Sequence, residues 1–191
     1  MGLRAFSRTK DQAPTGDLTT RLHAVRRCSA APSANEADGL TPDARLAAVA
    51  ALAEALRVVT KAAGVMREAA ELVIEAAGEP DEGPRALLAE RYDDARMRVD
   101  AFQEAMPAAA EPLLGLQAAT LEVPLRGATY AVAPFPLVTG EAGLDLPPPE
   151  DGFATHGEVA DTLRRVELAL ERLARLRAVW TADHAFLARD R

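Results

Sequence analysis

The chain has 191 residues, 49% of them hydrophobic, and a net charge of −7 at pH 7. This length and hydrophobic content are enough for one domain with its own core. An acidic chain without a clustered excess of Lys and Arg is not expected to bind nucleic acid, because phosphate neutralisation needs such a cluster. The single cysteine, Cys28, excludes an internal disulfide. No apolar run reaches the roughly 20 residues of a membrane span, so membrane insertion is not expected.

Residues 1–40 are predicted to be a flexible basic tail and linker. Their outer parts are rich in Pro, Ser, Gly and polar residues and lack the apolar surface needed to fold alone. Between these parts Asp17 can cap a short helix. Its apolar face would carry Leu18, Leu22 and Val25. The folded part is therefore expected over 41–191.

A long helix is predicted from Thr41 to about Ala77. The run Thr41-Pro42-Asp43 combines a capping hydroxyl, a proline tolerated at the first helical position and an acid in the first turn. Apolar residues then recur every three or four positions, which predicts one buried stripe along the helix. This stripe comprises Leu46, Val49, Ala53, Leu56, Val59, Ala63, Met66, Ala70, Val73 and Ala77.

A second helix is predicted from Pro84 to about Glu104, after a turn over 78–83. The turn contains two glycines and a proline, and its shortness makes the two helices antiparallel neighbours. The apolar stripe of this helix comprises Leu88, Tyr92, Ala95, Val99, Phe102 and Met106.

The hydrophobic period then changes from helical to alternating, which predicts a β-hairpin at about 120–133. Prolines and glycines make 134–152 an irregular crossover. Thr155 and Glu158 have the spacing of a capping box and predict the start of a last helix. Its apolar stripe comprises Val159, Leu163, Val166, Leu170, Leu173, Leu176 and Trp180. The predicted fold class is mainly α: an elongated antiparallel bundle of three long helices with a small β-hairpin.

No pattern in the sequence assembles a catalytic, cofactor or metal site. The three histidines, His23, His156 and His184, lie far apart, and none has a second ligand at helical spacing. The acidic pair Asp93-Asp94 is expected on a helix surface, where solvation does not drive two carboxyl pKa values apart. We therefore expect no enzyme, no cofactor, no metal and no small-molecule substrate, which leaves protein contact as the class of function.

Short blocks spread over residues 45–180 form an ordered set. The two clearest lie in the predicted helical hairpin: Glu71-Leu-Val-Ile-Glu-Ala-Ala-Gly78, and Arg85-Ala-Leu-Leu-Ala-Glu90 with Val99-Asp100. In composition and order the blocks resemble the core domain of bacterial flagellins of the alphaproteobacterial kind. The further blocks are Pro112-Leu-Leu-Gly115, Thr120-Leu-Glu-Val123, Gly143-Leu-Asp-Leu146, Phe153-Ala-Thr155 and the helix from Val159 to Leu176.

The resemblance implies a flagellin-like rod and a non-enzymatic structural or interaction protein of the bacterial flagellum. It implies partner contacts at the matched positions Glu71, Arg85 and Glu90. The long apolar-heptad segments with which flagellins polymerise have no counterpart in 1–40 or 184–191. The expected partner is flagellin or another flagellar component, and the expected location is the flagellum. The alternative is a cytoplasmic helical adaptor or regulator that binds a protein partner without being exported.

Overall fold

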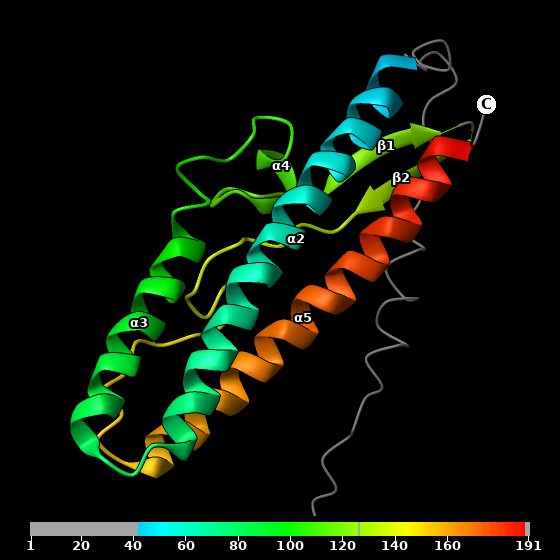
Figure 1. Ribbon diagram of the computed structural model, residues 1–191. Coiled ribbons are helices and arrows are strands. Elements are labelled where there is room, and N and C mark those ends of the chain that lie inside the picture. The colour runs from blue at the N-terminus through cyan, green and yellow to red at the C-terminus, as the bar shows by residue number, and fades with distance from the viewer. Residues whose placement is uncertain (1–41, 126, 190–191) are drawn as a thin grey trace, which may run out of the picture. The chain divides into compact units, whose positions relative to one another are not determined.

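The computed structural model describes residues 42–125 and 127–189, so the predicted tail and linker lie outside the described residues. Helices and strands follow one another in the order shown in Figure 1. They are α2 (Pro42–Gly78), α3 (Glu82–Asp100), α4 (Glu111–Leu114), β1 (Leu121–Leu125), β2 (Ala128–Val132) and α5 (His156–Arg189). The described part is mainly helical with one small antiparallel sheet, as predicted, and the short helix α4 was not foreseen.

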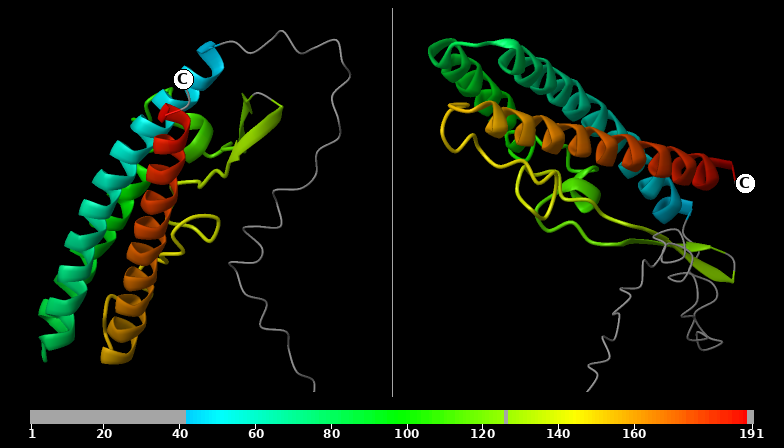
Figure 2. Two further views of the ribbon diagram at one scale, coloured as in Figure 1. Left: turned by 90° about the vertical axis from the view of Figure 1, so that its right-hand side faces the viewer. Right: turned by 90° about the horizontal axis from the view of Figure 1, so that it is seen from below.

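Helix α2 is the central element. It packs along both α3 and α5 and runs antiparallel to each of them, which confirms three long helices with antiparallel neighbours (Figure 1). With 37 residues, α2 is about 55 Å long at a rise of about 1.5 Å per residue. The hairpin and the irregular segments lie on one side of the three helices (Figure 2).

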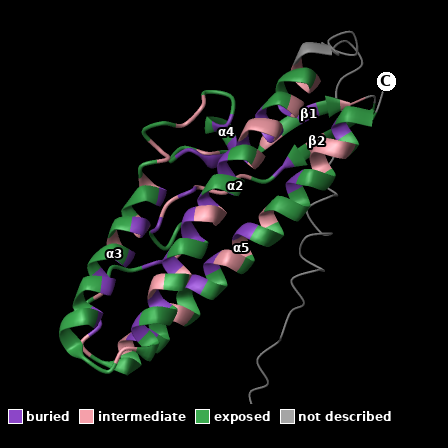
Figure 3. Ribbon diagram, in the orientation of Figure 1, coloured by how far each residue is buried: buried purple, intermediate pink, exposed green. Residues whose placement is uncertain are grey.

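The buried face of α2 differs from the predicted stripe. Leu46 is 65% exposed and Ala77 is also exposed, so both assignments to the core were wrong. Because α2 contacts α3 on one side and α5 on the other, its buried arc is wide, and small residues between the larger ones are also enclosed (Figure 3). The fully enclosed set on α2 includes Ala48, Leu52, Ala55, Val59, Ala62, Met66, Ala69, Val73 and Ala76.

Helix α3 buries four of the predicted residues, Leu88, Tyr92, Ala95 and Val99. It ends at Asp100 rather than near residue 104. The helical hydrogen-bond pattern tightens there, since the amide of residue 102 donates to Val99 O (3.2 Å). At the same point the carboxylate of Asp100 accepts hydrogen bonds from Thr139 in the crossover.

The β-hairpin occupies the predicted residues. Val123 pairs with Tyr130 and Leu121 pairs with Val132 in antiparallel register, and Gly127 supplies the left-handed turn conformation (φ 75°). The indole N–H of Trp180 on α5 donates to the carbonyl of residue 133, at 3.2 Å, just after β2. The hairpin is thus held to α5 by a buried aromatic side chain.

The crossover after β2 is irregular, as predicted, up to the start of α5. Thr155 Oγ1 accepts a hydrogen bond from the amide of Glu158 (3.1 Å), which confirms the first half of the predicted capping box. The return bond was predicted wrongly, because the Glu158 carboxylate accepts from the amide of Asp151 (3.1 Å) instead. On α5 the predicted stripe is the buried or half-buried face, with Val159, Val166, Leu173 and Trp180 fully enclosed.

Candidate functional site

Arg85, in the first turns of α3, is enclosed within the protein and only 6% exposed. Its guanidinium is planar, with five N–H donors, and can serve several acceptors at once. It donates to four main-chain carbonyls, those of Glu79 (3.1 Å), Pro80 (2.7 Å), Phe153 (2.9 Å) and Ala154 (2.8 Å). Arg85 therefore fastens the α2–α3 turn to the start of α5.

The chain enters α5 through two consecutive left-handed residues. Gly152 and Phe153 both have a φ of 61°, a conformation that costs a non-glycine residue about 1–2 kcal/mol. Phe153 holds it while fully buried, with its ring centroid 5.7 Å from that of Tyr92. Burial raises the pKa of the Tyr92 hydroxyl to about 12. In this conformation the carbonyls of residues 153 and 154 accept hydrogen bonds from the Arg85 guanidinium.

A polar network fastens the crossover to α3. Thr139, which is 4% exposed, donates its amide (2.8 Å) and its hydroxyl (2.6 Å) to the carboxylate of Asp100. Arg96 donates to the hydroxyl of Thr139 (3.1 Å) and pairs with Asp93 (2.6 Å). These groups satisfy one another's hydrogen-bonding capacity, so the network holds the crossover against α3.

A groove runs between α2 and α3. Tyr92 and Arg96 on α3 reach the crossover with their side chains. By helical periodicity, the α3 residues that line the groove lie on another side of that helix. Its α2 wall carries three carboxylates over a leucine, and its α3 wall carries two guanidinium groups, one carboxylate and an alanine. The lining residues are Glu68, Glu71, Leu72, Glu75, Arg91, Asp94, Ala95 and Arg98.

The structure separates the three predicted contact residues. Glu71 lies in the groove, whereas Glu90 is exposed on α3 but does not line it. Arg85 is engaged within the chain and has little surface left for a partner. Partner contact at Glu71 and Glu90 stays a prediction, and Arg85 is better explained by its internal hydrogen bonds.

Two large apolar side chains stand exposed on the same hairpin. Ile74 on α2 is 58% exposed, and Leu87 on α3 is 62% exposed. The charged walls of the groove between α2 and α3 were not predicted from the sequence. The spacing of Glu68, Glu71 and Glu75 and of Arg91 and Arg98 along two antiparallel helices was the signal that could have found these walls.

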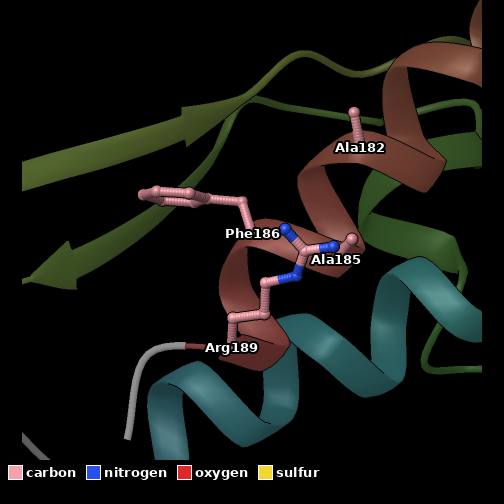
Figure 4. Close-up of a pocket in the computed structure, with 4 residues that line it drawn as sticks. All are labelled: Ala182, Ala185, Phe186 and Arg189. Atoms are coloured by element: carbon pink, nitrogen blue, oxygen red, sulfur yellow. The ribbon is translucent and has the colours of Figure 1, made fainter.

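A second hollow lies at the C-terminal end of α5. It is lined by Ala182, Ala185, Phe186 and Arg189, and Figure 4 shows Phe186 directed toward the β-hairpin formed by β1 and β2. The ring of Phe186 stacks on that of Tyr130 in β2, with centroids 4.8 Å apart. These four lining residues offer methyl groups, one aromatic face and one cation, which suits apolar contact rather than a reaction.

Within residues 42–125 and 127–189, no three His, Cys, Asp or Glu side chains are grouped so as to hold a metal ion. His156 begins α5 and His184 lies near its other end, while His23 and Cys28 fall outside the described residues. In the same part of the chain, no helix has the length and apolar character needed to cross a membrane.

Comparison with known proteins leaves the interpretation to this geometry. No family model, no curated protein and no solved structure matches the chain.

Proposed function

We propose that this chain is a non-enzymatic, flagellin-like structural and interaction protein of the bacterial flagellar system. The observation that carries the proposal is the charged groove between α2 and α3, in which Glu71 lies, together with the exposed side chains of Ile74 and Leu87 on the same two helices. Large apolar side chains rimmed by charges are typical of protein-contact surfaces. We assign this face, called here the hairpin face, to partner contact.

The polar groups enclosed in the fold support this division of roles. Arg85, Asp100 and Thr139 each bind main-chain or side-chain partners that hold the helices and the crossover together. Among the described residues, Arg98 and Glu68 form an ion pair on the hairpin face (2.7 Å), and both of these side chains are more than half exposed. Its charges are therefore accessible to a partner and contribute little to folding.

The same face would serve a cytoplasmic helical adaptor, which is the alternative function. Fractionation separates the two. The full chain is tagged and expressed in its own flagellated cells, flagella are sheared off, and the protein is quantified in the flagellar and cytosolic fractions. We expect recovery with the sheared flagella, and recovery only with the cytosol would exclude the structural role.

A charge reversal ties the result to the hairpin face. We expect Glu71→Lys to lower recovery in the flagellar fraction, because the substitution places a cation on the acidic wall of the groove. The matched control is Glu171→Lys, a charge reversal at another exposed glutamate, on α5, which should leave recovery unchanged. Equal recovery of both variants would contradict the assignment of this face.

A further inference from the structure

The two walls of the hairpin face carry opposite charge at matching heights. Arg98 pairs with Glu68 across the groove (2.7 Å), which fixes the register of two antiparallel helices. Because both helices rise equally per residue, seven residues from this pair Arg91 stands opposite Glu75. The α2 wall is thus acidic throughout, and the α3 wall is basic at both ends with Asp94 between them.

We infer that the occupant of the hairpin face is a second copy of this chain, docked about a two-fold axis parallel to the helices. The inference rests on the proposed assignment of this face to protein contact, and it does not depend on a flagellar role. An axis parallel to the helices exchanges left and right and preserves height. The α2 helix of one copy then lies antiparallel over the α3 helix of the other.

This arrangement pairs opposite charges at both ends of the groove. Glu75 of one copy comes level with Arg91 of the second copy, and Glu68 comes level with Arg98. The one unfavourable approach is that of Glu71 to Asp94, and it is flanked by the two arginines. Both copies make the same contacts, as a self-complementary interface requires.

The charges exclude the other face-to-face arrangement. A two-fold axis running across the helices would lay α2 on α2 and α3 on α3. The three carboxylates of one copy would then face three carboxylates, and guanidinium groups would face guanidinium groups, which opposes association. The parallel axis is therefore the symmetric solution that the sequence of charges permits.

Association on this face would also cover apolar surface. Leu87, 62% exposed on α3, precedes Arg91 by four residues and therefore lies on the same side of that helix as the groove lining. Four helices would pack together in an antiparallel arrangement, a geometry that is common in helical bundles. Small and apolar groups, Leu72 and Ala95, form the floor between the charged walls.

Two full-length variants of opposite charge test the inference. The acidic variant carries Arg91→Glu and Arg98→Glu, and the basic variant carries Glu68→Lys and Glu75→Lys. In a pair of identical acidic copies acid faces acid, and in a pair of identical basic copies base faces base. In a mixed pair every wall faces its opposite. A change within one chain cannot reproduce this result, because mixing restores only contacts between chains.

The measurement is the molar mass by light scattering during size-exclusion chromatography. We expect the wild-type chain to have twice its monomer mass of 20.3 kDa and each variant alone to be a monomer. The equimolar mixture of the two variants should have the mass of a dimer, like the wild type. The control exchanges an exposed pair on α5, with Glu171→Arg and Arg175→Glu, and should dimerise like the wild type. A monomeric wild type, a dimeric single variant or a mixture that stays monomeric would each overturn the inference.

Salt gives an independent readout on the unaltered chain. The dimer dissociation constant should rise at least tenfold between 0.1 M and 1 M NaCl, because the screening length falls from about 10 Å to about 3 Å. A constant unaffected by salt would contradict pairing through charges. All four substituted positions are exposed, and circular dichroism checks their folding. Should a double variant lose helix, the single changes Glu75→Lys and Arg91→Glu replace the pair in the same design.

The outcomes remain distinguishable from those of the proposed function. A monomeric protein that is recovered with sheared flagella would remove the second copy and keep the flagellar role. A charge-dependent dimer recovered only from the cytosol would keep the second copy and remove the structural role.

Discussion

Replacing Arg85 removes the group that joins the α2–α3 turn to the start of α5. A hydrogen bond from a charged donor contributes about 1.5–3 kcal/mol net. Of the four carbonyls that Arg85 serves, those of residues 79 and 80 belong to the α2–α3 turn, whereas those of Phe153 and Ala154 belong to the segment that enters α5. Counting the two bonds to that segment as lost, we expect Arg85→Ala to lower the free energy of unfolding by about 3–6 kcal/mol. This is a large share of the 5–15 kcal/mol or so that is typical of a domain.

The assay is urea unfolding of the full chain followed by far-ultraviolet circular dichroism. Arg85→Lys keeps the charge, but one ammonium group cannot reach carbonyls on both segments in the geometry of a guanidinium, so we expect about half the loss. The matched control is Arg177→Ala, an exposed arginine on α5 that lies outside the hairpin face, with an expected change within about 0.5 kcal/mol. A loss below about 1 kcal/mol for Arg85→Ala, or full stability of Arg85→Lys, would refute the assignment of Arg85 as a fastening between the two segments.

Three further changes probe the core, the pH dependence and the crossover. Val166→Asp should cost about 3–5 kcal/mol in urea unfolding because Val166 is fully enclosed, while Leu168→Asp, at a position 46% exposed, should be nearly neutral. Because burial raises the pKa of Tyr92 from 10.0 to about 12, stability is complete below pH 10 and falls as pH rises through 12, by up to about 3 kcal/mol. Unfolding curves across this range should show that Tyr92→Phe removes this part of the loss, and an unchanged pH profile would contradict the raised pKa. A Cβ at Gly143 would lie 2.3 Å and 2.6 Å from two main-chain oxygens, so Gly143→Ala should lower the thermal midpoint by the equivalent of about 1–3 kcal/mol. Gly140→Ala, with nothing within 4 Å, serves as its control.

Local signals were sufficient to predict the type of each long element and, to within two residues, where it begins, since α3 was predicted from Pro84 and begins at Glu82. The hydroxyl of Thr155 before α5 accepts from an amide within one turn, so the local sequence contains the whole interaction. The hairpin was predicted for the same reason, since its alternating pattern and glycine turn lie within a few residues. The end of α3 was missed because the Asp100 carboxylate bonds to Thr139, 39 residues away.

Long-range contacts explain the other misses. The buried face of α2 was misplaced because alanines occur all around this helix, and only the positions of α3 and α5 decide which of them are enclosed. Arg85 was expected at a partner contact. Two of its acceptors lie 68 and 69 residues further along the chain, and no local pattern announces them. The groove depends likewise on the register between Glu68 and Arg98, which the turn geometry sets.

Site-specific photo-crosslinking in flagellated cells tests the central claim, that the hairpin face is the protein-contact surface, most directly. In one variant a photoreactive residue replaces Glu71, and in a second variant it replaces Glu171 on α5. Both side chains are exposed. We expect adducts from position 71, containing a second copy of the chain or an identified flagellar component, and none from position 171. Adducts of equal yield at both positions, or no adduct at position 71, would contradict it.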